Sequence, residues 1–314
     1  MIISASRRTD IPAFYSAWFI NRVRTGWCQV PNPLNYNQLS YVSLKAKDVS
    51  AIVFWSKNPR PMLKYLDELD QQGLRYYFQF TINDYPRILE PKVPPVEERL
   101  NTFRELSSRL QPIRVVWRYD PIIISNLTPA SLHLEKFSHI AQSLRGYTRR
   151  VMVSLVDYYQ KTNRRLSVLE SRGVKFEKET QHSAATSELL AKIAVIAKQN
   201  DLEIFTCAEQ FDFSAVGIPP GQCIDGELIK RIWSIEVDMD KDPTQRAACL
   251  CVVSKDIGVN DTCLHGCPYC YATRNLRLAK RRALQHDPTS PVLWGRSRPL
   301  SEAEEADQLK ARLL

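Results

Sequence analysis

Short β-branched and aromatic segments alternate with longer amphipathic stretches along most of the chain, and this alternation restricts the fold more than any other feature. In the stretch 96–110, for example, Leu100, Phe103, Leu106 and Leu110 recur at spacings of three and four residues, which is the spacing of one buried helix face. Such alternation predicts βα units around a parallel sheet. The expected strands are 2–6, 51–55, 76–81, 114–119, 150–155 and 203–207, and the expected helices are 13–24, 61–72, 96–110, 131–144 and 187–200.

Six strands with intervening helices predict an α/β fold, either a partial TIM-like (β/α)6 barrel or an open doubly wound sheet. The chain has only ten glycines, and none of them forms the Gly-x-Gly-x-x-Gly loop of a dinucleotide-binding sheet. We therefore expect the partial barrel, with the functional groups at the carboxyl ends of its strands.

One barrel domain is expected over residues 1–295, including a cysteine-rich region at 249–272, followed by a polar tail over 296–314 that is a loose helix or disordered. The segment 160–183 is charged and lacks a clear period, so we expect a helical excursion or a lid over the barrel mouth. The sequence has no apolar run long enough for a membrane helix, and its first residues lack the order of a secretory signal. We therefore expect a cytoplasmic protein with no membrane partner.

Eight cysteines in a reducing compartment indicate metal ligands, nucleophiles or buried apolar residues rather than disulfides. Cys28 stands alone and is expected to pack in the core. The formal net charge of +9 would suit a polyanionic or phosphorylated partner, but a solvated basic surface without a partner is the simpler interpretation. The other seven cysteines fall in one stretch, which is not expected of core residues: Cys207, Cys223, Cys249, Cys251, Cys263, Cys267 and Cys270.

The last three of these cysteines, Cys263, Cys267 and Cys270, are spaced by three and then two residues. Thiolates are the usual ligands of iron–sulfur clusters, and a compact loop of this kind can hold three corners of a cubic [4Fe-4S] cluster. The fourth iron is then open to another ligand. Structural zinc is the alternative, with His265 as a fourth ligand, but zinc sites more often repeat a closely spaced pair at a distance. We therefore expect an iron–sulfur loop near the C-terminus of the chain.

This spacing, with the aromatic Tyr269 just before the third cysteine, resembles the signature of the radical S-adenosylmethionine superfamily. The resemblance implies that Cys263, Cys267 and Cys270 hold the cluster and that Tyr269 lies against the cofactor adenosine. It also implies that S-adenosyl-L-methionine binds the open iron and is cleaved reductively. The electron would come from a donor such as flavodoxin or ferredoxin. The Gly-Gly-Glu strand end found in much of that superfamily has no counterpart here.

A second resemblance, to the spore photoproduct lyase branch of that superfamily, lies in the middle of the chain. It rests on the segments 53–59 and 66–69 and on the run 87–100, which reads RILEPKVPPVEERL. In that branch the cluster loop precedes the strands, whereas here it follows them, so we expect a circular permutation with a short strand near 250–253 leading into the loop. With SRRTD at 6–10 and HDP at 286–288, the whole sequence is also similar to a bacterial family of unassigned reaction with a radical-SAM-like cysteine cluster at its C-terminus.

Polar residues follow the expected strands, and parallel strand ends converge on one face. We expect them to line one pocket under the cysteine loop, although ion pairs of Arg118 with Asp120 and of Arg8 with Asp10 would serve equally to tie loops together. The substrate, a small molecule or a nucleic acid, is expected to be anionic. The residues expected to bind it are Arg7, Arg8, Lys57, Asn58, Gln79 and Arg118, and those expected to orient it or exchange protons are Asp10, Lys57, Asp120 and Glu209.

Four cysteines remain, and several roles stay open for them. They can close a second [4Fe-4S] cluster or a structural zinc site, neither of which needs an open position. They can also be buried thiols, or Cys207 alone can donate a hydrogen atom. The four are Cys207, Cys223, Cys249 and Cys251.

A basic run follows the cysteine loop and indicates a second possible class of function. The protein would then be a non-catalytic nucleic-acid-binding module stabilised by zinc or iron–sulfur. A solvated helix is the simpler interpretation of that run. The favoured hypothesis is therefore an iron–sulfur enzyme that starts radical chemistry. The basic run comprises Arg274, Arg277, Lys280, Arg281 and Arg282.

Overall fold

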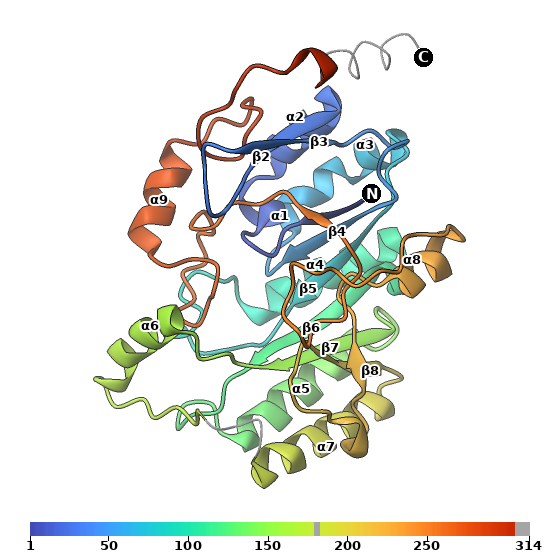
Figure 1. Ribbon diagram of the computed structural model, residues 1–314. Coiled ribbons are helices and arrows are strands. Elements are labelled where there is room, and N and C mark those ends of the chain that lie inside the picture. The colour runs from blue at the N-terminus through green and yellow to red at the C-terminus, as the bar shows by residue number, and fades with distance from the viewer. Residues whose placement is uncertain (179–182, 305–314) are drawn as a thin grey trace.

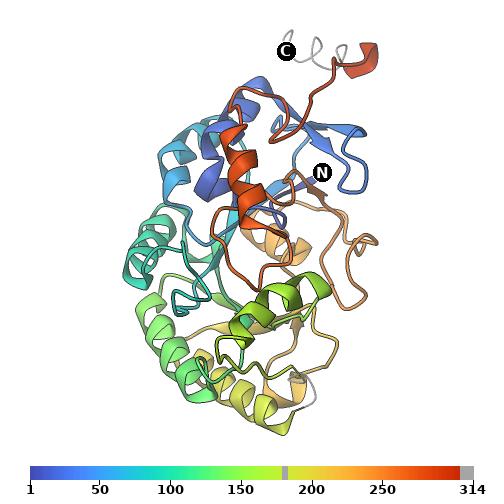
Figure 2. The same ribbon diagram turned by 90° about the vertical axis from the view of Figure 1, so that its left-hand side faces the viewer.

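A parallel sheet of eight strands forms the centre of the computed structural model, which describes residues 1–178 and 183–304. The sheet curls into a half-barrel, with helices around its outer side (Figures 1 and 2). Its strand order is β10-β1-β4-β5-β6-β7-β8-β9. The strands are β1 (Ile2–Ala5), β4 (Ala51–Ser56), β5 (Tyr76–Thr81), β6 (Val115–Ile122), β7 (Arg150–Leu155), β8 (Glu203–Cys207), β9 (Pro220–Gly221) and β10 (Lys255–Asp256).

All six expected strands are present in the sheet, as β1 and β4 to β8. The strand count of six was too low, because β9 and β10 are two residues long and lie at the two edges. The structure shows an α/β half-barrel with open edges rather than a closed barrel. A separate antiparallel hairpin, β2 (Trp27–Pro31) with β3 (Leu39–Ser43), was not predicted.

The helices between the strands pack against the convex face of the sheet, where they form the arc seen in Figure 2. The expected helix at 96–110 is confirmed without change as α4. Burial of its apolar stripe contributes roughly 1.5–3 kcal/mol for each large side chain. The outer helices are α1 (Ile11–Phe14), α2 (Ser16–Thr25), α3 (Leu66–Gln71), α4 (Val96–Leu110), α5 (Ala130–Leu144) and α7 (Ala184–Gln199), with 3-10 turns η1 (Arg60–Tyr65), η2 (Pro112–Arg114) and η3 (Ser214–Val216).

Both faces of the sheet are buried, and each packs against different elements. Phe54 and Trp117 belong to the cluster that includes the outer helices, whereas Val53, Val116 and Met152 belong to the concave cluster. The concave cluster is completed by α8 (Gly226–Trp233) and by residues 249–252. Because side chains alternate along a strand, the concave face continues to the carboxyl ends of the strands, where the side chains become polar.

Strand β10 delivers the cysteine loop to the edge of the sheet beside β1, with which it pairs in parallel. Asp256 fixes this edge, because its carboxylate accepts hydrogen bonds from Ser4 Oγ (2.6 Å), Ser6 Oγ (2.8 Å) and the backbone N–H of Arg7 (2.8 Å). A Cβ at Gly258 would lie 1.9 Å from Ser6 Oγ, so only glycine allows this approach. The strand expected near 250–253 therefore lies a few residues later than predicted.

The segment 160–183 contains helix α6 (Gln160–Glu170), which lies near α9 (Leu276–Leu284) on one side of the molecule (Figure 1). Residues 179–182 of that segment lie outside the described residues. At the start of the expected tail, the Gln29 side chain donates to the Arg298 carbonyl at 2.9 Å and accepts from the Arg298 backbone N–H at 3.1 Å. The rest of the tail, residues 305–314, lies outside the described part of the chain. Among the described helices, none is both long and apolar enough to cross a bilayer.

Candidate functional site

A cavity of about 570 Å³ opens at the carboxyl ends of the strands. All seven cysteines between 207 and 270 line it, although they come from the end of β8, from the loops before and after α8, and from the loop after β10. Three cations from three different strand ends, Arg7, Lys57 and Arg118, share this cavity with them. Of the other expected site residues, Arg8, Asp10, Asp120 and Tyr269 also line its wall.

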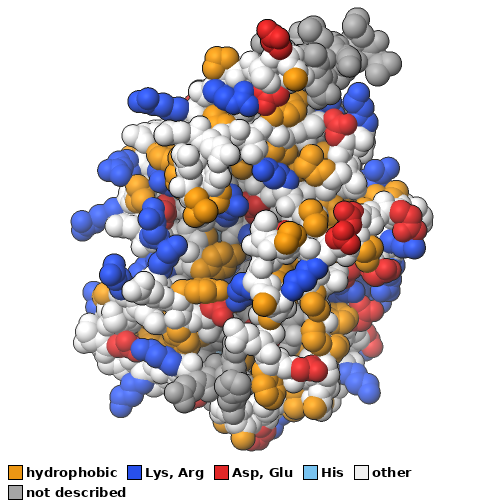
Figure 3. Space-filling view, in the orientation of Figure 1, with side chains coloured by type: hydrophobic (Ala, Val, Ile, Leu, Met, Phe, Trp, Pro, Cys, Tyr) orange, Lys and Arg blue, Asp and Glu red, His pale blue; other side chains and the backbone are white. Residues whose placement is uncertain are grey.

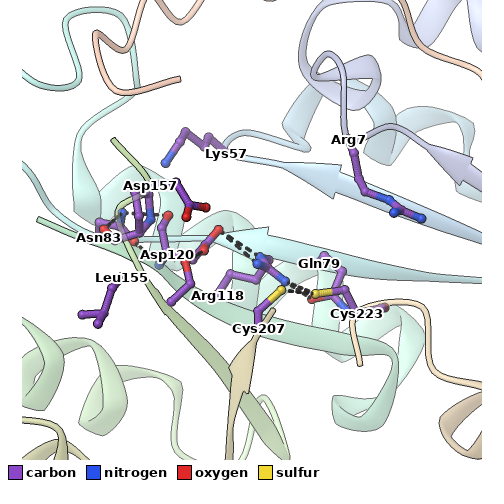
Figure 4. Close-up of polar contacts among 12 residues, drawn as sticks. Arg7, Lys57, Gln79, Asn83, Arg118, Asp120, Leu155, Asp157, Cys207 and Cys223 are labelled. Carbon is purple, nitrogen blue, oxygen red and sulfur yellow. Dashed lines mark hydrogen bonds and ion pairs between the residues drawn. The ribbon is translucent and has the colours of Figure 1, made fainter. Parts of the chain in front are cut away.

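Arg118 lies at the floor of the cavity, between Asp120 and the cysteine pair Cys207 and Cys223 (Figure 4). It is 4% exposed, and its Nη2 lies 3.1 Å from Asp120 Oδ2, while its Nη1 donates to Cys223 Sγ at 2.7 Å. Burial acts to raise the pKa of Asp120, but Arg118 and a hydrogen bond from Ser154 Oγ hold it below its ordinary value. Asp120 is therefore an ionised acceptor at neutral pH.

A second buried network joins Lys57 to the cysteine loop through Glu90. The Glu90 carboxylate is 2% exposed; its Oε1 accepts hydrogen bonds from Lys57 Nζ (2.8 Å) and Tyr269 OH (2.5 Å), and its Oε2 lies 3.8 Å from Arg99 Nη1. Burial acts to raise the Glu90 pKa, but Lys57 and Arg99 lower it to about 2. The Lys57 ammonium also lies 5.6 Å from the centre of the Tyr269 ring.

Asp10 connects strand ends to the cysteine loop instead of offering a free carboxylate. Its Oδ1 accepts hydrogen bonds from Ala13 N (2.9 Å) and Ser56 Oγ (2.7 Å), and its Oδ2 from Lys57 N (2.8 Å) and His265 Nε2 (2.8 Å). The hydrogen bond to Asp10 occupies Nε2 of His265, the residue that is the fourth ligand in the zinc alternative. Both oxygens of the Asp10 carboxylate thus accept hydrogen bonds from groups of the protein itself.

The loop that carries Cys263, Cys267 and Cys270 is held by several local features. Gly266 has a φ of +76°, which a side chain would strain. The His265 backbone N–H faces the sulfur of Cys263. From α6, Arg165 donates hydrogen bonds to three backbone carbonyls of the loop and its exit, those of Pro268, Cys270 and Arg274.

As the side chains stand, no three His, Cys, Asp or Glu side chains in the described part of the chain are arranged to hold a single metal ion. A cubic cluster needs more widely spaced ligands than a single ion, because its irons and sulfides stand between them. The three sulfurs of the loop meet the donor requirement of such a cluster, since all three line the cavity from one compact loop.

Three expected site residues are absent from the described wall of the cavity. Asn58 lies in the turn after β4, where its Oδ1 accepts from Arg60 N at 3.4 Å. Gln79 is 1% exposed beneath the floor and donates to the Cys223 carbonyl at 2.8 Å. Glu209 Oε1 accepts from the backbone N–H of Leu155 at 2.8 Å.

Of the two ion pairs that were the alternative to a binding pocket, one is present and one is absent. Arg118 does pair with Asp120. Arg8, in contrast, lies 4.0 Å from Asp256 and not against Asp10, so the expected Arg8–Asp10 pair is wrong. Sequence reasoning also missed Glu90, Arg99, Arg165 and Asp256; the signal for the first two was their place in the 87–100 run.

Replacing Glu209 with glutamine is expected to flatten the pH dependence of stability between about pH 4.5 and 8. Burial raises the pKa of Glu209 from 4.5 to about 8, so over this window the folded state holds a proton that the unfolded state has lost. Wild-type stability therefore falls as the pH rises through that window, by on the order of 1–3 kcal/mol from this group. Urea unfolding at pH 5.5 and 8.5 measures the difference.

The matched control is Glu203→Gln, which changes an exposed carboxylate at the start of β8. It should leave the wild-type pH dependence in place. An equally steep loss of stability in Glu209→Gln and in wild type would contradict the assignment.

The fold and site together define an α/β half-barrel protein with a cysteine-lined cavity at its strand ends. A family described as "Domain of unknown function (DUF1848)" matches residues 2–272, which include the sheet and all seven clustered cysteines. The chain therefore belongs to this family. Comparison with curated proteins gave no match.

Proposed function

We propose that this protein is a radical S-adenosylmethionine-type enzyme, cytoplasmic, that acts on an anionic substrate. The observation that carries the proposal is the position of the three-cysteine loop at the cavity formed by the strand carboxyl ends, where parallel α/β folds bind their ligands. Cys263, Cys267 and Cys270 would hold a [4Fe-4S] cluster. With S-adenosyl-L-methionine bound, that group supplies a carbon-centred radical after one-electron reduction by a flavodoxin or ferredoxin type of donor.

The strand order supports a permuted form of the superfamily's TIM-like barrel. β10 lies spatially before β1, and the rest follow in chain order from β4 to β9. The loop after β10 thus occupies the position of a loop after the first strand. In such a permutation the segment between β9 and β10, which contains α8, joins one edge of the half-barrel to the other.

The residues of the chain itself would act by binding and orientation. Tyr269 is fixed by its hydrogen bond to Glu90, which would hold its ring for the adenosine. Two of the three cavity cations are close to a carboxylate: Lys57 lies 2.8 Å from Glu90 and Arg118 lies 3.1 Å from Asp120. The ion pair of Arg7 among the described residues is longer, 4.0 Å to Asp242. Arg7 would therefore be the main anchor of a substrate anion. Asp120, ionised beside Arg118, would orient the substrate.

A test of the proposed activity uses the full chain reconstituted anaerobically with iron and sulfide. Reduction with dithionite in the presence of S-adenosylmethionine is expected to yield 5′-deoxyadenosine, measured by liquid chromatography and mass spectrometry. The Cys270→Ala variant serves as the control and should yield none. A colourless zinc protein that leaves S-adenosylmethionine intact would contradict the proposal.

The alternative, a nucleic-acid-binding module, has one observation in its favour. Lys and Arg side chains gather along the edge formed by α6 and α9 (Figure 3). Two of the five basic residues expected there are engaged within the protein, however: Arg274 with Asp261, and Arg282 with the Asn260 carbonyl. Retention of nucleic-acid binding by the metal-free chain, together with zinc in the native protein, would favour the module.

A further inference from the structure

The four cysteines outside the C-terminal loop form a second, continuous group of sulfurs. The Sγ atoms of Cys207 and Cys223 are 2.9 Å apart, Cys251 interacts electrostatically with both Cys223 and Cys249, and all four side chains line the same cavity. None of them is in a disulfide. They come from three separate segments: the end of β8, the loop before α8 and the segment before β10.

Two of these sulfurs accept N–H donors, as thiolates bound to a metal commonly do. Arg118 Nη1 donates to Cys223 Sγ at 2.7 Å, and the backbone N–H of Ile224 donates to Cys251 Sγ at 3.4 Å. The backbone N–H of Cys251 also interacts with the sulfur of Cys249. The guanidinium of Arg7 also interacts electrostatically with Cys251. The buried Arg118 and the partly buried Arg7 thus face the group.

We propose that Cys207, Cys223, Cys249 and Cys251 bind one tetrahedral thiophilic ion, zinc or a single iron, at a site separate from the Cys263–Cys270 loop. The ion replaces the four thiol protons, which are released to solvent.

The short separation of Cys207 and Cys223 favours one ion over a cubic cluster, and the presence of four interacting sulfurs, where a disulfide joins only two, favours an ion over a disulfide. A disulfide has an S–S distance of about 2.05 Å, and four thiolates around zinc, at about 2.3 Å from the metal, stand about 3.8 Å from one another. The observed 2.9 Å lies between these two values, whereas the ligands of a cubic cluster stand further apart than either. The sulfurs now form a chain, without a ready ion site among the described residues, so the ion draws them into a tetrahedron.

The charges and the fold explain what such an ion would do. Four thiolates around a divalent ion carry a net charge of about −2, which would be costly to bury without a counter-charge. The buried Arg118 offsets part of that charge, and the partly buried Arg7 interacts with Cys251 from the cavity side. The ion would fasten the segments on both sides of α8 to the end of β8. It would thereby hold the concave cover of the half-barrel and the wall of the cavity in place.

Metal analysis of two full-length variants tests this site apart from the proposed activity. The variant Cys263→Ala, Cys267→Ala, Cys270→Ala is expected to retain about one zinc or iron per chain, as one tetrahedral site requires. Addition of Cys249→Ser and Cys251→Ser to it should lower the content at least tenfold. Cys28→Ser, which changes a buried cysteine outside both groups, is the matched control and should not change it.

A second measurement on the wild-type chain keeps the test decisive if the added substitutions prevent folding. Alkylation with and without a chelator, read by peptide mass spectrometry, should show the four cysteines protected only while the ion is bound. Cobalt bound in its place should give the intense visible bands of a tetrahedral thiolate site. The proposal is overturned by a metal-free triple variant, by about four irons on these cysteines, or by a Cys207–Cys223 disulfide in the native protein.

Discussion

Replacing Cys263, Cys267 and Cys270 with alanine is expected to remove about four irons per chain after anaerobic reconstitution, that being the content of one cubic cluster. All three sulfurs line the strand-end cavity, so their loss leaves no thiolate ligand on that loop. Production of 5′-deoxyadenosine should fall below detection. Iron and sulfide analysis, with the visible absorption of the reconstituted protein, measures the change.

Two controls separate loss of the cluster from loss of the fold. The Cys28→Ala variant removes a buried thiol on β2 and should keep its full iron content. The triple variant should also keep the far-ultraviolet circular dichroism of the wild type, since the loop contributes no strand or helix. Full retention of iron in a folded triple variant would show that the loop is not the cluster site.

The extent to which the sequence predicts the fold depends on the length of each element. The strands β5 and β7, each of six residues, carry enough β-branched and aromatic residues for their limits to be predicted correctly. β9 and β10 have two residues each, which is too short for any periodicity. The position of β10 depends on contacts that are remote in sequence, such as those of Asp256 with β1.

The same reasoning applies to the cavity. The convergence of parallel strand ends predicts that Arg7, Lys57 and Arg118 meet, and they line one cavity. It does not predict how far below the strand ends a side chain lies. Thr81 is the register partner of Arg118 at the floor of the cavity, and Gln79, two residues earlier on the same strand, is buried beneath that floor. Glu90 lies in a loop well beyond the end of β5, so no strand-end rule could find it.

Glu90→Gln is expected to lower the free energy of unfolding by about 3–5 kcal/mol, because removal of one partner leaves buried charges uncompensated. Lys57 and Arg99 both interact with this carboxylate, and their side chains are 15% and 3% exposed. The amide keeps the shape of the side chain but removes its charge, so the loss reports the electrostatic contribution. Urea denaturation at pH 7 measures it. Glu98→Gln, exposed one residue from Arg99, is the matched control and should cost less than about 1 kcal/mol.

The pH dependence and a double variant distinguish this ion-pair effect from general damage to the core. Because the pKa of Glu90 is lowered from 4.5 to about 2, its contribution is complete above about pH 5 and is lost as the pH falls toward 2. The difference between wild type and Glu90→Gln should therefore be constant from pH 5 to 8 and shrink in acid. In the double variant Lys57→Met with Glu90→Gln, removal of one orphaned cation should recover part of the loss. A double variant as unstable as the sum of its two single variants would mean that Lys57 and Glu90 act independently, and the ion-pair explanation would then be wrong.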